Sequence, residues 1–104
     1  MKEIQNYPEF ESLPADRETF ILYAQSEDCG VCKAFLPAVE NLAGQCNIPL
    51  YGVQIDRLPV MRGQLSIFTV PLISVYFKGR EYHRQARFLQ LEEVKRRLEE
   101  KHRL

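Results

Sequence analysis

The chain of 104 residues has no tryptophan, only three cysteines and no excess of charge of either sign. Its 14 basic residues balance its 14 acidic ones, which argues against nucleic acid or a membrane surface as the main partner. Three cysteines are too few for a framework of structural disulfides. No apolar run is long enough to span a bilayer, and residues 1–6 lack the apolar core of a signal peptide. We therefore expect a cytoplasmic protein with one domain over residues 1–104.

Apolar runs separated by turn residues predict an α/β domain. A buried strand is expected at residues 19–24 and a helix at residues 30–44, where apolar positions recur with helical spacing. The remaining main elements are predicted as strands at residues 50–55, 72–77 and 81–88, and helices at residues 59–65 and from residue 91 onward. The order βαβαββα predicts a central mixed β-sheet with helices on both faces.

Smaller features refine this prediction. Ile4 is expected in a short edge strand, and Asn6 is expected to cap a brief helix over residues 8–13 that Pro14 ends. Pro37 removes one backbone donor from the helix at residues 30–44 and is expected to kink it.

Cys29 and Cys32 are spaced one helical turn apart, directly after an apolar strand and at the start of a helix. This context turns a short Cys-x-x-Cys pattern into an indication of a redox-active pair. A structural or unused thiol pair and half of a zinc site are the alternatives, but adding His83 or His102 leaves the zinc ligand set incomplete. We expect no bound metal and no cofactor besides the cysteine pair.

Several motifs together resemble the thioredoxin family over almost the whole chain. Residues 29–33 read Cys-Gly-Val-Cys-Lys, similar to the family's Cys-Gly-Pro-Cys-Lys, and Pro37 falls where the family's active-site helix carries a proline. The segment at residues 69–71 (Thr-Val-Pro) resembles the family's loop with a cis proline beside the cysteines. Further matches are Ile55-Asp56 followed by Pro59, and Phe77-Lys78-Gly79.

The resemblance implies a thioredoxin-like fold and a thiol–disulfide oxidoreductase that reduces protein disulfides and is restored by an external reductase. Cys29 is then the nucleophile, because unpaired amides and the helix dipole favour a thiolate at a helix N-terminus. Cys32, one turn further in, is the more buried resolving thiol. We expect a monomer. The alternative is a thioredoxin-fold binding or redox-sensor module with little general reductase activity.

Four positions around the cysteine pair depart from the family pattern. Asp28 replaces the usual tryptophan, and Tyr23 and Gly52 align with a buried carboxylate and its lysine partner. Arg87 aligns with a glycine beside the substrate groove. Tyr23 either packs in the core or relays a proton through a hydrogen bond to water or to the second thiol, and Glu27 is a rival for that relay. Glu27 and Asp28 are also expected to oppose the thiolate, with Arg87 as a counterweight.

The Val70–Pro71 peptide bond is expected to be cis, which exposes the Val70 backbone for strand-like pairing with a substrate. Cys46 lies on the apolar face of its predicted helix. It is either a small core residue or a regulatory thiol.

Overall fold

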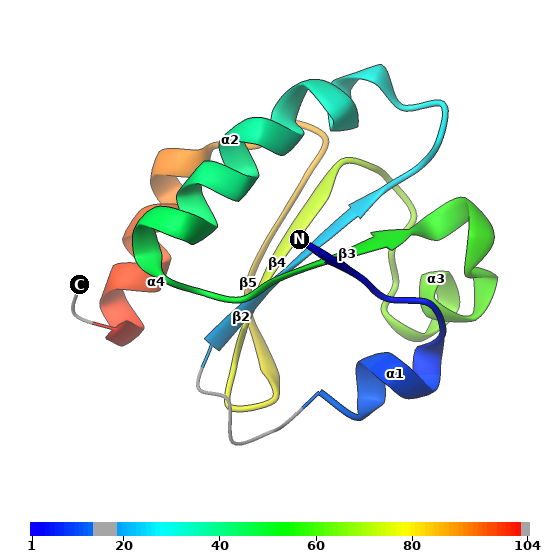
Figure 1. The fold of residues 1–104 in the computed structure, drawn as a ribbon, viewed down its shortest axis with the longest axis horizontal. Helices are drawn as coiled ribbons and strands as arrows, with labels where there is room; N and C mark the ends of the chain where they lie inside the picture. Colours follow the sequence, from blue (N-terminus) through cyan, green and yellow to red (C-terminus); the bar gives the residue numbers. More distant parts are fainter. Residues whose placement is uncertain (14–18, 103–104) are drawn as a thin grey trace.

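The computed structural model describes residues 1–13 and 19–102, and a five-stranded mixed sheet lies at its centre (Figure 1). Across the sheet the order is β1-β3-β2-β4-β5. β1, β3 and β2 run parallel, whereas β4 is antiparallel to β2 and β5 is antiparallel to β4. The strands are β1 (Lys2–Glu3), β2 (Thr19–Gln25), β3 (Leu50–Gln54), β4 (Leu72–Phe77) and β5 (Arg80–Ala86).

Helices cover both faces of the sheet (Figure 1). The helices α2 (Gly30–Cys46) and α4 (Leu91–His102) pack on one face, and α1 (Tyr7–Glu11) and α3 (Pro59–Gln64) pack on the other. Because side chains alternate along a strand, Ile21 and Tyr23 of β2 join the first core and Leu22 and Ala24 join the second. The whole of β2 is therefore buried, as its continuous apolar sequence predicts.

The predicted order βαβαββα is confirmed from β2 to α4, with β1 and α1 preceding it. Several predicted boundaries were wrong. β2 continues to Gln25 and α2 to Cys46, and α3 ends at Gln64. The predicted strand at residues 50–55 ends at Gln54, because Ile55 begins a 3₁₀ helix, η1 (Ile55–Arg57). The last strand begins at Arg80 and ends at Ala86 instead of covering residues 81–88. Lys78 and Gly79 both have positive φ, so these two residues form the whole hairpin turn.

The N-terminal elements are shifted by a few residues from their predicted positions. Asn6 is the N-cap of α1, as predicted, and its Oδ1 accepts a hydrogen bond from the Glu9 amide at 2.9 Å. The helix covers Tyr7–Glu11 instead of residues 8–13. Ile4 lies just beyond β1, and its amide donates to the Gly52 carbonyl at 2.7 Å. The predicted stop at Pro14 lies outside the described residues.

Pro37 lies inside α2, which continues on both sides of it; a kink there stays a prediction. Within residues 1–13 and 19–102, none of the helices combines the length and the apolar character needed to cross a membrane.

Candidate active site

The two cysteines of the motif lie at the N-terminus of α2, after the central strand β2. Their sulfurs form a disulfide, and their Cα atoms are 5.2 Å apart. Cys29 is the N-cap residue, and its Sγ accepts a hydrogen bond from the Cys32 amide at 3.1 Å. Cys29 is partly exposed, whereas Cys32 has no exposed surface. A partner molecule can therefore contact Cys29 but not Cys32.

The segment before β4 lies at the same end of the sheet as the cysteines. Ala24 at the end of β2 pairs with Leu72 at the start of β4, so the segments beyond these two residues meet. The Val70–Pro71 peptide bond is cis, Pro71 is buried and Val70 is half-buried. Val70 and Ser26, which precedes the motif, line one pocket of about 170 Å³. The fold therefore brings the cysteine motif and the Val-Pro segment to one end of the sheet.

Tyr23 of β2 contacts the backbone of the cysteine motif. Its hydroxyl donates a hydrogen bond to the Cys32 carbonyl oxygen at 2.7 Å, and the side chain is fully buried. Burial raises the pKa of Tyr23 to about 12, so the hydroxyl stays protonated at neutral pH. The hydroxyl therefore donates to the backbone of Cys32 and not to its sulfur, which is the bond that a relay through the second thiol would need. Tyr23 packs in the core and donates a hydrogen bond to a backbone carbonyl.

Gly52 lies beside Tyr23 in the sheet, so the two positions that align with the family's carboxylate and lysine are neighbours. A Cβ atom at Gly52 would lie 2.8 Å from the Sδ and Cε atoms of Met1. The space beside this glycine is therefore occupied by the thioether of the first residue, and the aligned pair carries no charge in this chain.

Glu27 and Asp28 differ in their surroundings, although both are exposed. The Glu27 carboxylate lies 3.1 Å from Nη2 of Arg57 in η1, and the Glu27 amide donates to the Asp56 carboxylate at 3.4 Å. Asp28 has no ion pair within the part of the chain that the structure describes. The Glu27 carboxylate is therefore paired with a cation of η1, whereas the carboxylate of Asp28, which directly precedes Cys29 in the sequence, is not paired with a described residue.

Arg87 adjoins the cis proline through its backbone. Its amide donates to the Pro71 carbonyl at 2.8 Å, and its φ of 70° is in the left-handed region that favours glycine. This fits its alignment with a family glycine. The exposed Arg87 side chain forms no ion pair with a described residue, and its role as a counterweight to Glu27 and Asp28 stays a prediction.

Two exposed aromatic residues near this end of the sheet were missed by the sequence analysis. Phe68 is 68% exposed and precedes the Thr-Val-Pro segment, and Phe88 is 83% exposed and follows Arg87. Val31, between the cysteines, is also exposed. Their positions next to predicted site residues were the only available signal, because single apolar side chains are common on protein surfaces and carry no signal by themselves.

Cys46 and His83 are not part of the disulfide site. Cys46 is buried in the core under α2, and burial raises the pKa of its thiol. Burial lowers the pKa of His83, whose Nε2 lies 3.0 Å from Nε2 of Gln85. The side chain of His102 is outside the described part. Among the side chains that are described, no three of His, Cys, Asp and Glu are grouped to hold a metal ion.

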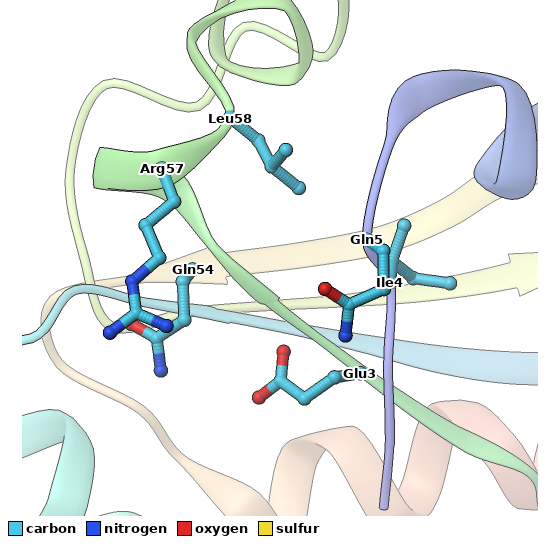
Figure 2. A pocket seen from close by; sticks show the side chains of 6 residues that line it. All are labelled: Glu3, Ile4, Gln5, Gln54, Arg57 and Leu58. Carbon is cyan, nitrogen blue, oxygen red and sulfur yellow. The ribbon is translucent and has the colours of Figure 1, made fainter.

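A second pocket, of about 230 Å³, lies at the β1–β3 edge of the sheet and contains none of the predicted site residues. Figure 2 shows Glu3 from the N-terminal strand facing Gln54 and Arg57, which come from the segment after β3. Burial raises the pKa of Glu3, and the Arg57 guanidinium acts against this shift. Arg57 also forms the ion pair with Glu27, so this pocket is linked to the segment that precedes the cysteine motif.

These observations define a class of protein. It is a small α/β domain with a Cys-x-x-Cys disulfide at the start of a helix, after the central strand and at the same end of the sheet as a cis proline.

Comparison with known proteins identifies the family. The sequence profile described as Thioredoxin matches residues 2–100. The thioredoxin-like protein YdfQ of Bacillus subtilis (strain 168) is 33% identical over 84 residues, covering 80% of this chain and 75% of that protein. Mitochondrial thioredoxin O of Oryza sativa subsp. japonica is 35% identical over 81 residues, covering 75% of this chain and 44% of that protein. The chain thus spans less than half of that relative's length.

The fold agrees with this result. Thioredoxin from Plasmodium falciparum superposes with a TM-score of 0.84 at 22% identity, covering 96% of this chain and 98% of that one. The chain therefore belongs to the thioredoxin family. With its bonded cysteine pair, this membership supports thiol–disulfide oxidoreductase chemistry in general.

Proposed function

We propose that this chain reduces disulfides of protein substrates, with Cys29 as the nucleophile and Cys32 as the resolving thiol. The observation that carries the proposal is their unequal burial at the start of α2. A substrate sulfur can reach Cys29, where unpaired backbone amides and the positive end of the helix dipole favour a thiolate. Cys32 is reached only through the sulfur of Cys29.

The proposed reaction has two exchange steps. The Cys29 thiolate attacks one sulfur of the substrate disulfide, so a Cys29–substrate bond forms, the substrate disulfide breaks and its other sulfur leaves as a thiolate. Cys32 then loses its proton to solvent and attacks Sγ of Cys29, which releases the second substrate sulfur. Both leaving thiolates take up protons from solvent. The substrate gains two electrons and the cysteine pair loses two, which leaves the Cys29–Cys32 disulfide.

The substrate segment is proposed to lie along Val70. An extended chain pairs with exposed backbone groups through hydrogen bonds that do not depend on its sequence, which suits an enzyme acting on many disulfides. Phe68 and Phe88 offer apolar contact area near this segment. One chain carries both cysteines, so the reaction needs no second copy.

Turnover requires an external reductase, because each cycle oxidises the cysteine pair. Reduction of substrates as the net direction fits a reducing compartment such as the cytoplasm, where protein disulfides are mostly transient. The two sulfurs carry both electrons, so the proposed reaction uses no bound cofactor or metal.

Serine variants test the assignment of the two thiols. With insulin as the substrate and dithiothreitol as the reductant, Cys29→Ser is expected to lower turnover to the rate of dithiothreitol alone. Cys32→Ser is expected to accumulate a mixed disulfide through Cys29, visible by mass spectrometry, because the resolving attack is lost. Cys46→Ser is the matched control and should keep wild-type turnover.

Other results would contradict the proposal. If Cys32→Ser were inert toward insulin while Cys29→Ser still formed a mixed disulfide, the two roles would be reversed. If the wild-type chain cycled between dithiol and disulfide but never accelerated insulin reduction, the binding or redox-sensor alternative would replace the reductase.

A further inference from the structure

Arg84 connects β5 to the segment that carries the cis proline. Its Nη1 donates to the Ser66 carbonyl at 2.8 Å, and its Nη2 donates to the Leu65 carbonyl at 2.7 Å. Its Nε donates to the Glu81 carboxylate at 2.7 Å. A planar guanidinium has donors on two edges, so it serves both carbonyls and the carboxylate at once. The Arg84 side chain is 29% exposed, and its guanidinium is bonded to protein groups on both edges.

Both carbonyls lie where the chain leaves α3 and turns toward β4. Leu65 is the C-cap residue of α3, and Ser66 has a φ of 54°. Carbonyls at a helix C-terminus lack partners within the helix, which makes them good acceptors for an arginine. Ile67, the next residue, is fully buried. The segment is thus anchored at its start by Arg84 and by a core side chain.

The other end of the same segment is also attached to β5. The Arg87 amide donates to the Pro71 carbonyl at 2.8 Å. Between the two attachments only Phe68, Thr69 and Val70 are exposed or half-buried. The edge strand therefore determines where the Val70 backbone lies at the end of the sheet that carries the cysteines.

Arg84 is itself held from two strands. The carboxylate of Glu81, its ion-pair partner, also accepts a hydrogen bond from the hydroxyl of Ser74, which is fully buried on β4. Residues three apart in a regular strand point to opposite faces. Here the register shift opposite Val75 and Tyr76 inserts one extra residue in β5, so Glu81 and Arg84 share a face. The bulge therefore allows Glu81 to bond to both Arg84 and Ser74.

We propose that Arg84 is a positioning residue for substrate: it holds the segment at residues 65–70 so that the Val70 backbone meets a protein disulfide beside Cys29. This inference rests on the proposed function. It predicts that loss of the guanidinium slows reactions in which a polypeptide must dock. Reaction with a small disulfide, which needs only the sulfur of Cys29, is left unchanged.

The test is Arg84→Lys, which keeps the charge but replaces the planar fork by one ammonium group. The rate constant for insulin reduction is expected to fall about tenfold, since misplacing a binding element by a fraction of an ångström is enough for such a loss. The rate with a small aromatic disulfide and the pH midpoint of Cys29 alkylation should stay at wild-type values. Arg80→Lys is the matched control, because Arg80 is exposed on the same strand and its side chain has no partner among the described residues.

An activity-independent measurement separates this inference from the proposed function. The Ile67 amide donates to the Arg62 carbonyl at 2.9 Å, so its hydrogen exchange reports on this segment. In oxidised Arg84→Lys its exchange should accelerate about tenfold, as expected for a local opening. The Ile4 amide, bonded to Gly52 at the other edge of the sheet, should not change. If wild type fails to reduce insulin, the reductase proposal fails while Ile67 exchange still decides the role of Arg84.

Several outcomes would overturn the assignment. They are an insulin rate within twofold of wild type, an equal loss toward the small disulfide, and unchanged exchange at Ile67. If Arg84→Lys does not fold, Glu81→Gln weakens the same group by replacing a charge-assisted bond with a neutral one. A loss of about two- to threefold toward insulin alone is then expected, and no loss would refute the proposal.

Discussion

At the scale of single residues, Tyr23 shows how a position can keep its place in a family fold while its chemistry changes. It lies in mid-strand below the cysteines, where the family carries a carboxylate. The hydroxyl is the donor to the Cys32 carbonyl, and burial raises the pKa of Tyr23 to about 12. A group that stays protonated across the physiological range cannot accept the proton that Cys32 releases. We therefore expect that proton to leave through solvent after Cys29 has reacted.

Tyr23→Phe tests this structural role. The variant should lose about 1–2 kcal/mol in the free energy of unfolding at pH 7, because a buried carbonyl loses a donor. Urea denaturation measures the loss. Tyr7→Phe is the control, since the Tyr7 hydroxyl has no hydrogen-bond partner within the described residues, and it should change stability by less than about 0.5 kcal/mol. If Tyr23→Phe also changed the free energy of unfolding by less than about 0.5 kcal/mol, the expected contribution of this hydrogen bond would be refuted.

The pH dependence of Tyr23→Phe has a definite sign. The folded pKa of Tyr23 lies above the ordinary value of 10.0, so the unfolded chain loses this proton first as the pH rises. The contribution of Tyr23 is fully present below pH 10.0 and is lost as the pH approaches 12. The stability difference between wild type and Tyr23→Phe should therefore shrink between pH 10.0 and 12. A constant difference over that interval would contradict the raised pKa.

At the scale of elements, the short connection between β2 and α2 determines the charge around the reactive sulfur. The connection is held to η1 by the Glu27–Arg57 ion pair and by the bond from the Glu27 amide to Asp56. Both members of the ion pair are 64% exposed, so the pair contributes at most about 1 kcal/mol to stability. The pair matters for where the Glu27 carboxylate lies, because it holds this negative charge beside the Arg57 guanidinium of η1.

Charge variants in this connection should separate the two acids. Asp28→Asn is expected to lower the pKa of the Cys29 thiol, because it removes an unpaired negative charge beside the developing thiolate. The double variant Glu27→Gln with Arg57→Gln should leave that pKa nearly unchanged, since it removes one charge of each sign. The pH dependence of iodoacetamide alkylation of the reduced protein measures both. The shift in Asp28→Asn should be larger at low salt than at high salt.

Each outcome bears on the position of a side chain. If Asp28→Asn left the alkylation midpoint unchanged at low salt, its carboxylate would have to point away from the sulfur. A large shift in the double variant would mean that one member of the ion pair acts on the thiol alone.

At the scale of the whole molecule, two cores on opposite faces of one sheet hold the site from both sides. The core under α2 and α4 supports the cysteine helix, and the core under α1 and α3 supports the segment before the cis proline. Cys46 lies in the first core among buried residues of β2, α2 and α4. Its thiol is reached only when these elements separate.

Cys46 can therefore report on opening of the first core. With Cys29 and Cys32 oxidised, the native protein should show almost no reactive thiol toward an aromatic disulfide reagent. One thiol per chain should react in denaturant, because two of the three cysteines are bonded to each other. Burial raises the pKa of Cys46, which lowers its reactivity further. Cys46→Ala should show no reactive thiol in either condition, whereas fast reaction of native wild type would favour the regulatory-thiol reading.

Local sequence was sufficient for much of this protein. The apolar run of β2, the thiols spaced one turn apart and the helical spacing after them are contiguous signals. They predicted the strand, the helix and the cysteine motif without reference to the rest of the chain. The Asn6 cap was predicted for the same reason, because it depends on the conformation of neighbouring residues only.

Tertiary structure alone decided the contacts around the site. The Glu27–Arg57 pair joins residues 30 apart, and Arg84 reaches carbonyls 18 and 19 residues away. Such contacts depend on strand order, on register and on the bulge in β5. A slip of one residue in register would turn every side chain of a strand to its other face. Sequence patterns specify which face of an element is buried. Only the assembled sheet specifies which residues, distant in the sequence, contact that face.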